Sequence, residues 1–138
     1  MGYVHATIDI ANGWELENAR RGLMAKDEVR RMQIQVLVDT GSMNLCINEV
    51  VRETLQLPLI ETQRSVLADG GVIECDIVGP IEVRFKNRNC LIIATVLPGD
   101  NECLLGAFPM EAMDILVDPK RGELVVNPAH PDYSIHRI

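Results

Sequence analysis

The hydrophobic pattern of this chain is made of short alternating runs, which are typical of strands. Apolar side chains recur at every second position over residues 3–10 and 32–38, and the second run becomes continuously apolar towards Val38. A period of two indicates a strand with one buried face, and a continuous run indicates burial on both faces. We therefore predict strands over 3–10 and 32–38. The turn signal Asn12-Gly13 and the charged stretch 15–31 predict a solvated loop or short helix between them.

A short helix is predicted after the second strand. Apolar residues recur at helical spacing between Ile47 and Leu55, Asn48 can cap the start of the helix, and Pro58 stops it. One or two further helical turns are predicted over 108–113. The helix after Asn48 is expected to pack behind the loop that follows Val38.

The middle of the chain predicts hairpins. Residues 64–67 and 72–78 are rich in β-formers and flank Asp69-Gly70-Gly71, which is a strong short-range hairpin signal. After the break Gly79-Pro80, residues 81–85 and 90–97 flank the polar turn 86–89. Short strands are predicted over 115–117 and 124–126. The pattern predicts a mainly β domain over 1–128 with one or two short helices, followed by an irregular tail over 129–138.

Composition and charge narrow the class of protein. The 138 residues fit one domain, and hydrophobic residues make up 47% of them, whereas aromatic residues make up only 4%. A core built mostly from Val, Ile and Leu favours a sheet. The net charge of −7 argues against nucleic acid as the main partner, because a phosphate backbone attracts a basic surface.

The cysteines favour a reduced compartment. Cys46, Cys75, Cys90 and Cys103 form no C-x-x-C pair and have no histidine at metal-ligand spacing. We interpret them as small apolar residues, and we predict no metal and no cofactor. The start of the chain lacks a basic segment followed by an apolar one, and no stretch is long enough to span a membrane. We therefore expect a cytoplasmic protein without a membrane partner.

The strongest candidate for chemistry is Asp39-Thr40-Gly41-Ser42, directly after the buried strand. Burying a lone carboxylate at the end of a strand costs free energy, so a functional role would explain its presence at this position. Because the chain has only one Asp-Thr-Gly, a catalytic pair needs a second chain. Two close carboxylates share one proton, so that one acts as a general base on water and the other as a general acid. On the motif alone, an Asx-turn at a strand end explains the residues equally well.

Four segments in order resemble the retroviral-type (retropepsin-like) aspartic proteases, especially the small single-domain bacterial members. The resemblance covers the chain from about Tyr3 to Pro128. The first segment is 37–42, which is similar to the catalytic loop. The second, 67–70, is similar to the tip of the flap hairpin. The third, Leu104-Leu105-Gly106, precedes a short helix, and the fourth is the pair 115–119 and 124–128.

The resemblance implies a closed β-barrel of the acid-protease fold with one lobe per chain, and a homodimer with one Asp39 from each subunit. It further implies that Thr40 grips the partner's loop and that Ser42 donates a hydrogen bond to Asp39. Leu105 and Gly106 would support the catalytic loop. The flap, formed by Ala68, Asp69, Gly70 and Gly71, would close over an extended peptide, and residues 124–126 would pair in the dimer. The implied activity is that of an aspartic endopeptidase.

Two departures and several alternatives remain. The flap tip carries Asp69 where retroviral flaps have glycine or apolar residues, and the 15–31 segment is longer than the matching turn. A catalytically silent dimer that serves as a binding or assembly module is the first alternative. A phosphate-binding turn is the second, although the chain is short for the two lobes that it requires. A Cys-His protease using Cys46 or Cys103 needs a histidine brought close by the fold, and a metal site at Asp114 and Asp118 needs further ligands.

Overall fold

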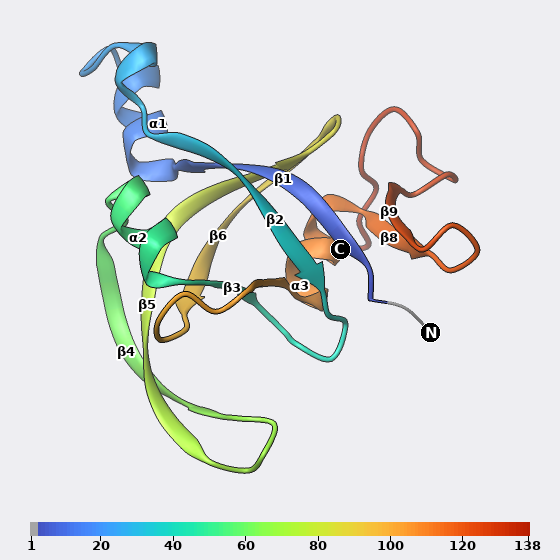
Figure 1. Ribbon diagram of the computed structural model, residues 1–138. Helices are drawn as coiled ribbons and strands as arrows, with labels where there is room; N and C mark the ends of the chain where they lie inside the picture. The colour runs from blue at the N-terminus through green and yellow to red at the C-terminus, as the bar shows by residue number, and fades with distance from the viewer. Residues whose placement is uncertain (1–2) are drawn as a thin grey trace.

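The computed structural model describes residues 3–138 as a small barrel with helices at its margins (Figure 1). Its strands are β1 (His5–Asn12), β2 (Arg31–Val38), β3 (Leu45–Ile47), β4 (Leu59–Val66), β5 (Val72–Phe85), β6 (Arg88–Val96), β7 (Cys103–Leu105), β8 (Ile115–Asp118) and β9 (Glu123–Val126). Its helices are α1 (Gly13–Arg20), α2 (Glu49–Leu55) and α3 (Ala107–Met113), with a 3-10 turn η1 (Lys26–Glu28). This is the mainly β architecture that the sequence predicts.

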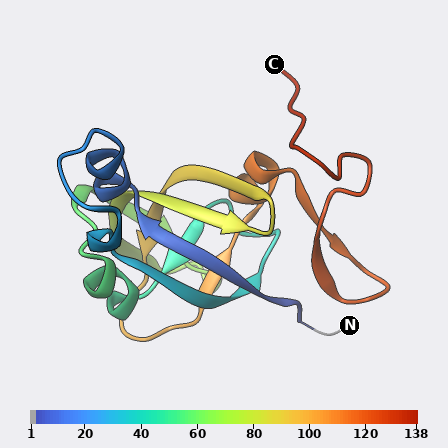
Figure 2. The same cartoon turned by 90° about the horizontal axis from the view of Figure 1, so that it is seen from above.

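Six strands close the barrel in the order β1-β2-β7-β3-β6-β5, and β5 pairs back onto β1. The closure is visible in Figures 1 and 2 as a ring of strands around one interior. β4 pairs only with β5, outside the ring, and the two strands form a long hairpin that extends beyond the barrel. β8 and β9 form a separate two-stranded sheet. A closed ring leaves few unpaired strand edges, and here the outer edge of β4 is one of them.

β7 lies between two strands that are joined by one loop. It runs parallel to β2, with Leu37 opposite Leu104 and Val38 opposite Leu105, and antiparallel to β3, with Leu45 opposite Leu105. The loop over 39–44 connects β2 to β3, so the two strands on either side of this loop are both held by β7. The position of the loop therefore depends on a strand from a distant part of the sequence.

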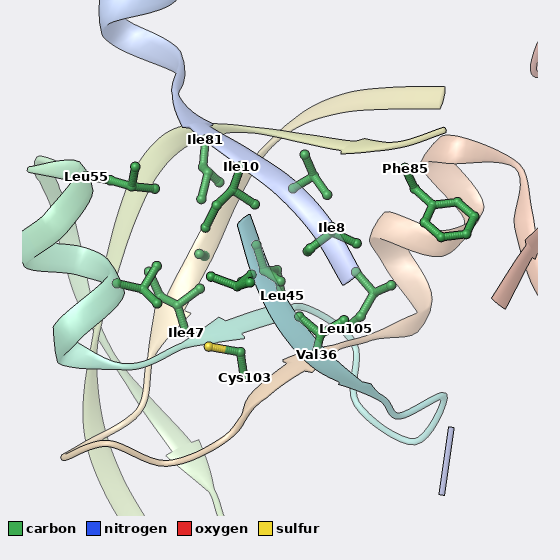
Figure 3. Packing of buried hydrophobic residues seen from close by; sticks show 14 of the residues in the cluster. Ile8, Ile10, Val36, Leu45, Ile47, Leu55, Ile81, Phe85, Cys103 and Leu105 are labelled. Carbon is green, nitrogen blue, oxygen red and sulfur yellow. The ribbon is translucent and has the colours of Figure 1, made fainter. Parts of the chain in front are cut away.

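The core fills the interior of the barrel with aliphatic side chains. Figure 3 shows the central group, to which β1, β2, β3, β5 and β7 all contribute: Ile8, Ile10, Val36, Leu45, Ile47, Ile81 and Leu105. Leu55 of α2 and Phe85 at the end of β5 close the group at its margins. Branched aliphatic side chains fit the pleated surface of strands, which explains how so few aromatic residues suffice.

Three predicted boundaries were wrong. Asn12 is not part of a turn but caps α1, where its side-chain oxygen accepts a hydrogen bond from the backbone N–H of Glu15. Ile47, predicted to lie on the helix face, belongs to β3, and α2 begins one residue after its cap Asn48. Gly79-Pro80 does not divide two strands, because β5 continues through it with a shift in pairing register.

The tail after β9 has no helix or strand, as predicted, but it is anchored. Asp114 accepts hydrogen bonds from the Asn127 side chain at 3.0 Å and from the Ile135 backbone N–H at 3.1 Å, and its carboxylate lies 2.7 Å from His130 Nδ1. The buried guanidinium of Arg88 donates to the carbonyl oxygen of His130 and lies 3.5 Å from Asp114. These contacts tie the tail to the end of α3 and to the start of β6.

None of the helices in the described part of the chain is long and apolar enough to cross a membrane. The four cysteines are all free. The prediction that the chain lacks a leader segment concerns its first residues, of which 1 and 2 lie outside the described residues.

Candidate functional site

The loop over residues 39–44, here named the Asp39 loop, forms a tight turn at the end of β2. Asp39 is half-buried, and Thr40 and Gly41 are exposed. One carboxylate oxygen of Asp39 accepts a hydrogen bond from the Gly41 backbone N–H at 3.0 Å, and the backbone N–H of Ser42 donates to the Asp39 carbonyl oxygen at 3.0 Å. This is Asx-turn geometry, which leaves the other carboxylate oxygen free of any hydrogen bond from residues 3–138. The carboxylate thus combines a fixed orientation with access from outside.

Backbone hydrogen bonds connect the loop to the segment that runs from β7 into α3. The Asp39 N–H donates to the Leu105 carbonyl oxygen at 3.0 Å, and the Gly106 N–H donates to that of Asn44 at 3.0 Å. Two further bonds run from the start of α3 to the loop: Ala107 N–H to Ser42 oxygen at 2.8 Å, and Phe108 N–H to Met43 oxygen at 2.9 Å. Leu105 and Gly106 therefore contact the Asp39 loop, and these contacts are made by the backbone.

Gly106 lies so close to this loop that a side chain does not fit. A Cβ atom there would come within 2.5 Å of the Asn44 carbonyl oxygen and 2.6 Å of the Ser42 carbonyl oxygen. Both neighbours are backbone atoms, which cannot rotate away as a side chain can. The glycine is therefore required for close approach, because its φ of −89° is one that any residue adopts.

The expected hydrogen bond between Ser42 and Asp39 is not formed in the single chain. The Ser42 hydroxyl lies 3.9 Å from the sulfur of Cys46, and the Gly41 N–H contacts the carboxylate instead. The reason is local: the Asx-turn aims the carboxylate at the backbone of the turn.

The hairpin β4–β5 carries the segment predicted as a flap. Its tip, residues 67–71, closes with hydrogen bonds from the Leu67 N–H to the Gly71 oxygen at 2.8 Å and from the Gly70 N–H to the Leu67 oxygen at 2.9 Å. The Asp69 side chain accepts from the Gly71 N–H at 2.8 Å, which explains this acid as a turn residue. Ala68, Asp69, Gly70 and Gly71 are all exposed. In Figure 1 the hairpin and the Asp39 loop project from the same side of the barrel.

A cleft of about 430 Å³ lies between the β4–β5 hairpin and β7. The hairpin contributes Leu67 and Ile73 to its lining, and β7 contributes Leu104, which pairs with Leu37 in β2. The loop between β6 and β7 supplies the remaining wall. The hairpin, β7 and the 97–102 loop thus surround one open space, which no residue of the Asp39 loop lines, and its volume lies within the range of about 300–1,000 Å³ typical of ligand sites.

The 97–102 loop, with Asn101 and Glu102, forms a wall of the cleft that the sequence pattern does not predict. Glu102 lies directly before the Cys103-Leu104-Leu105-Gly106 run, and this adjacency is the one signal that pointed to it. A second, larger cleft of about 760 Å³ lies near α1 and is lined by residues such as Trp14, Leu59 and Pro80. It includes no residue of the Asp39 loop.

The other chemistry considered from the sequence is disfavoured. Burial raises the pKa of the Cys46 and Cys103 thiols, which keeps them protonated near neutral pH. Each of the three histidines has a partner other than a cysteine: His5 contacts Glu102, His130 contacts Asp114, and His136 contacts the Ala112 carbonyl oxygen. Over residues 3–138 no three His, Cys, Asp or Glu side chains converge as a metal site. Asp118 accepts backbone hydrogen bonds within its own turn.

No protein-family model and no curated protein sequence matches the chain. Among solved structures, the chain is similar to the retroviral protease-like domain of Ddi1 from Leishmania major. The TM-score is 0.57 at 13% sequence identity, and the match covers 93% of this chain and 90% of that chain. At this identity the likeness concerns the fold. Together with the closed barrel and the pairing around β7, it confirms that the chain has the retropepsin-like fold.

Proposed function

We propose that this protein is an aspartic endopeptidase that acts as a homodimer, with Asp39 from each subunit forming the catalytic pair. One observation carries the proposal: an accessible carboxylate sits on a loop whose backbone is bound to β7 and α3 by four hydrogen bonds. Such fixed placement of a reactive group is what catalysis by positioned acids and bases requires. A turn that served only to reverse the chain would not need support from a distant strand.

The dimer follows from the chemistry. The described chain offers one Asp-Thr-Gly loop, and a second copy supplies its counterpart across a two-fold axis. Thr40 and Gly41 are exposed and free to contact the partner's loop. Strand β9, which includes residues 124–126, forms a small sheet with β8 outside the barrel and is available for pairing in the dimer.

In the proposed mechanism the two carboxyl groups share one proton. The ionised carboxylate takes a proton from a water molecule while the water oxygen attacks the peptide carbonyl carbon. The protonated carboxyl group gives its proton to the carbonyl oxygen. Proton transfer to the leaving nitrogen then breaks the carbon–nitrogen bond and yields an acid and an amine. The peptide lies extended under the β4–β5 hairpin, which acts as a flap through Ala68, Asp69, Gly70 and Gly71. No metal or cofactor takes part in these steps.

The proposal also covers the cellular compartment of the protein. The free cysteines and the absence of disulfide bonds among residues 3–138 suit a reducing compartment, so we place the enzyme in the cytoplasm. We retain the resemblance to small bacterial members of the family as part of this proposal.

The test is cleavage of a mixed peptide library between pH 3 and pH 8 by the wild type, Asp39→Asn and Asp118→Asn. Asp118 is a matched control, because it also accepts backbone hydrogen bonds within a turn but is the last residue of β8. We expect cleavage by the wild type and Asp118→Asn, loss in Asp39→Asn, and inhibition by a statine-type transition-state mimic. A confirmed dimer that cleaves nothing at any pH would contradict the proposal and favour a silent binding module.

A further inference from the structure

The cleft between the β4–β5 hairpin and β7 has apolar walls and a single acid. Its lining consists of Leu67, Ile73, Leu97, Pro98, Asn101, Glu102 and Leu104. Glu102 is the only ionisable side chain among these lining residues. A long aliphatic side chain with a cationic end fits such a surface, because its hydrocarbon stem packs on apolar walls while its charge reaches the carboxylate.

Glu102 has capacity left for a cation. One carboxylate oxygen lies 2.7 Å from His5 Nε2, and the other accepts no hydrogen bond from the described residues. The Glu102 side chain is 51% exposed and that of His5 is 38% exposed. An ion pair at this exposure is weak, so it does not prevent Glu102 from binding a second cation.

The cleft is adjacent to the site of the proposed chemistry. Leu104 lines it, and the next residue, Leu105, accepts the backbone hydrogen bond from Asp39. Leu67 and Ile73 bring the hairpin against its other side. A side chain held here therefore belongs to a peptide residue close to the bond presented to Asp39. Asp69 at the hairpin tip has no ion pair with a described residue and lies two positions from the lining residue Leu67, so its charge adds negative potential to this end of the hairpin.

We propose that this cleft is a specificity pocket for a lysine or arginine side chain of an extended peptide, and that Glu102 is the residue that recognises its charge. The inference rests on the proposed peptidase function for its role in catalysis. Its content is the substrate class: peptides with a basic residue near the cleaved bond, surrounded by apolar positions.

The test uses one peptide scaffold in which each position in turn carries lysine, arginine, norleucine or glutamate. Norleucine keeps the hydrocarbon stem of lysine and removes the charge. For the wild type, we expect kcat/KM for lysine or arginine to exceed that for norleucine by about tenfold or more at one position, as for a charge-assisted hydrogen bond. Glu102→Gln should bring the ratio close to one, and Glu102→Lys should make the glutamate peptide the best substrate.

Asp100→Lys is the matched control. Asp100 lies on the same loop, and the substitution changes the charge equally, but its side chain does not line the cleft. This variant should keep the preference for basic peptides. If Asp100→Lys removes the preference as strongly as Glu102→Lys, the effect comes from overall charge and the pocket assignment is wrong.

Binding separates this inference from the proposed function. Fluorescence anisotropy with labelled, uncleaved peptides measures the affinity of Asp39→Asn for each peptide, with and without Glu102→Lys, in the absence of catalysis. Tighter binding of lysine over norleucine peptides that reverses with Glu102→Lys supports the inference even where the wild type cleaves nothing. Equal binding of the two peptides overturns it, even where the wild type is an active peptidase.

Discussion

The backbone N–H of Asp39 donates a hydrogen bond to the carbonyl oxygen of Leu105 at 3.0 Å, and this bond joins the candidate catalytic loop to β7. The next residue, Gly106, donates to Asn44 at the far side of the same loop. The loop is thus held at both ends by two consecutive residues. The orientation of the Asp39 carboxylate therefore depends on the packing of residues 105 and 106.

Replacing Gly106 with alanine is expected to displace the Asp39 loop. The added Cβ meets backbone atoms of Ser42 and Asn44 within 2.6 Å, and overpacking of this kind costs about 1–3 kcal/mol in the free energy of unfolding. Peptidase activity should fall by more than the loss of folded protein explains, because the carboxylate moves. Urea unfolding and kcat/KM, measured on the same preparations, check both effects.

Gly22→Ala is the control for this substitution. Gly22 follows α1 with a φ of +77°, and a Cβ atom there would meet no other atom within 4 Å, so alanine costs about 1–2 kcal/mol through backbone strain alone. The helix that it follows, α1, lies at the opposite end of β1 and β2 from the loop that joins β2 to β3 (Figure 1). We expect a comparable loss of stability with kcat/KM unchanged. Equal losses of activity in the two variants would show that Gly106 acts only through stability.

Asp39→Asn is expected to stabilise the proposed dimer while abolishing the proposed peptidase activity. Two carboxylates brought close together repel each other unless they share a proton, and asparagine removes this cost. The dissociation constant from analytical ultracentrifugation at pH 7 should decrease about tenfold, which corresponds to about 1.4 kcal/mol. An unchanged dissociation constant would indicate that the two side chains do not meet, and would favour the catalytically silent dimer over the peptidase.

Asn12 is expected to contribute to stability as both a donor and an acceptor. It is 3% exposed, its oxygen caps α1 at the Glu15 N–H, and its amide donates to the carbonyl oxygens of Leu55 and Gln56 at the end of α2. Asn12→Ala should cost about 2–3 kcal/mol in the free energy of unfolding, the sum of a lost cap and an unsatisfied carbonyl. Thermal and urea unfolding measure this loss.

Asn12→Asp separates the two roles. Aspartate keeps the acceptor for the Glu15 N–H but cannot donate to Leu55, and its charge faces carbonyl oxygens in a buried position. We expect it to be as destabilising as alanine or more so at pH 7. Stability equal to the wild type would mean that the connection between α1 and α2 contributes nothing.

Protonation of Asp114 is expected to make the protein less stable at acid pH. The hydrogen bond from the Asn127 amide, followed by those from the Ile135 N–H and His130, holds the pKa of Asp114 well below its usual value of about 3.9. A carboxyl group with a lowered folded-state pKa stabilises the fold above its unfolded pKa, and this contribution is lost as the pH falls towards its folded pKa. The contribution should therefore be complete above about pH 5 and decline below pH 4.

Urea unfolding of the wild type and Asp114→Asn at pH 7, 5, 4 and 3 measures the contribution of Asp114. The difference in unfolding free energy between the two proteins should be constant at the upper two values and shrink at pH 3. A difference that stays constant down to pH 3 would contradict the role assigned to the carboxylate. The result also matters for assays of the proposed peptidase, which include acid conditions.

The strands and hairpins of this fold are predictable because each follows from local pattern. Alternation indicated β2, and the Asp-Gly turn marked the β4–β5 hairpin. β3 was missed because it has only three residues, Leu45–Ile47, and because the spacing of Ile47 also fits a helix. Strand formation there depends on pairing with β6 and β7, which local sequence does not encode.

The candidate site was predictable only in part, for a similar reason. The Asp39 motif is contiguous, and the segment 104–106 was found because its order along the chain resembles a known family. The contact of Ser42 depends on a side-chain rotamer, and the expected bond to Asp39 is not made. Apart from its position directly before residues 103–106, Glu102 carries no local signal, because it becomes a wall of the cleft only when the hairpin and β7 approach each other.

The insertion of β7 between β2 and β3 also sets the order in which the protein matures during translation. Residues 31–47 leave the ribosome well before residues 103–105, which bridge the two strands that flank Asp39. Pairing between such distant segments forms late, because the intervening chain must first be closed into a loop. Until residues 103–105 have emerged, a growing polypeptide therefore lacks the strand that fixes the position of the Asp39 turn, and the proposed pair of carboxylates cannot assemble on a shorter nascent chain.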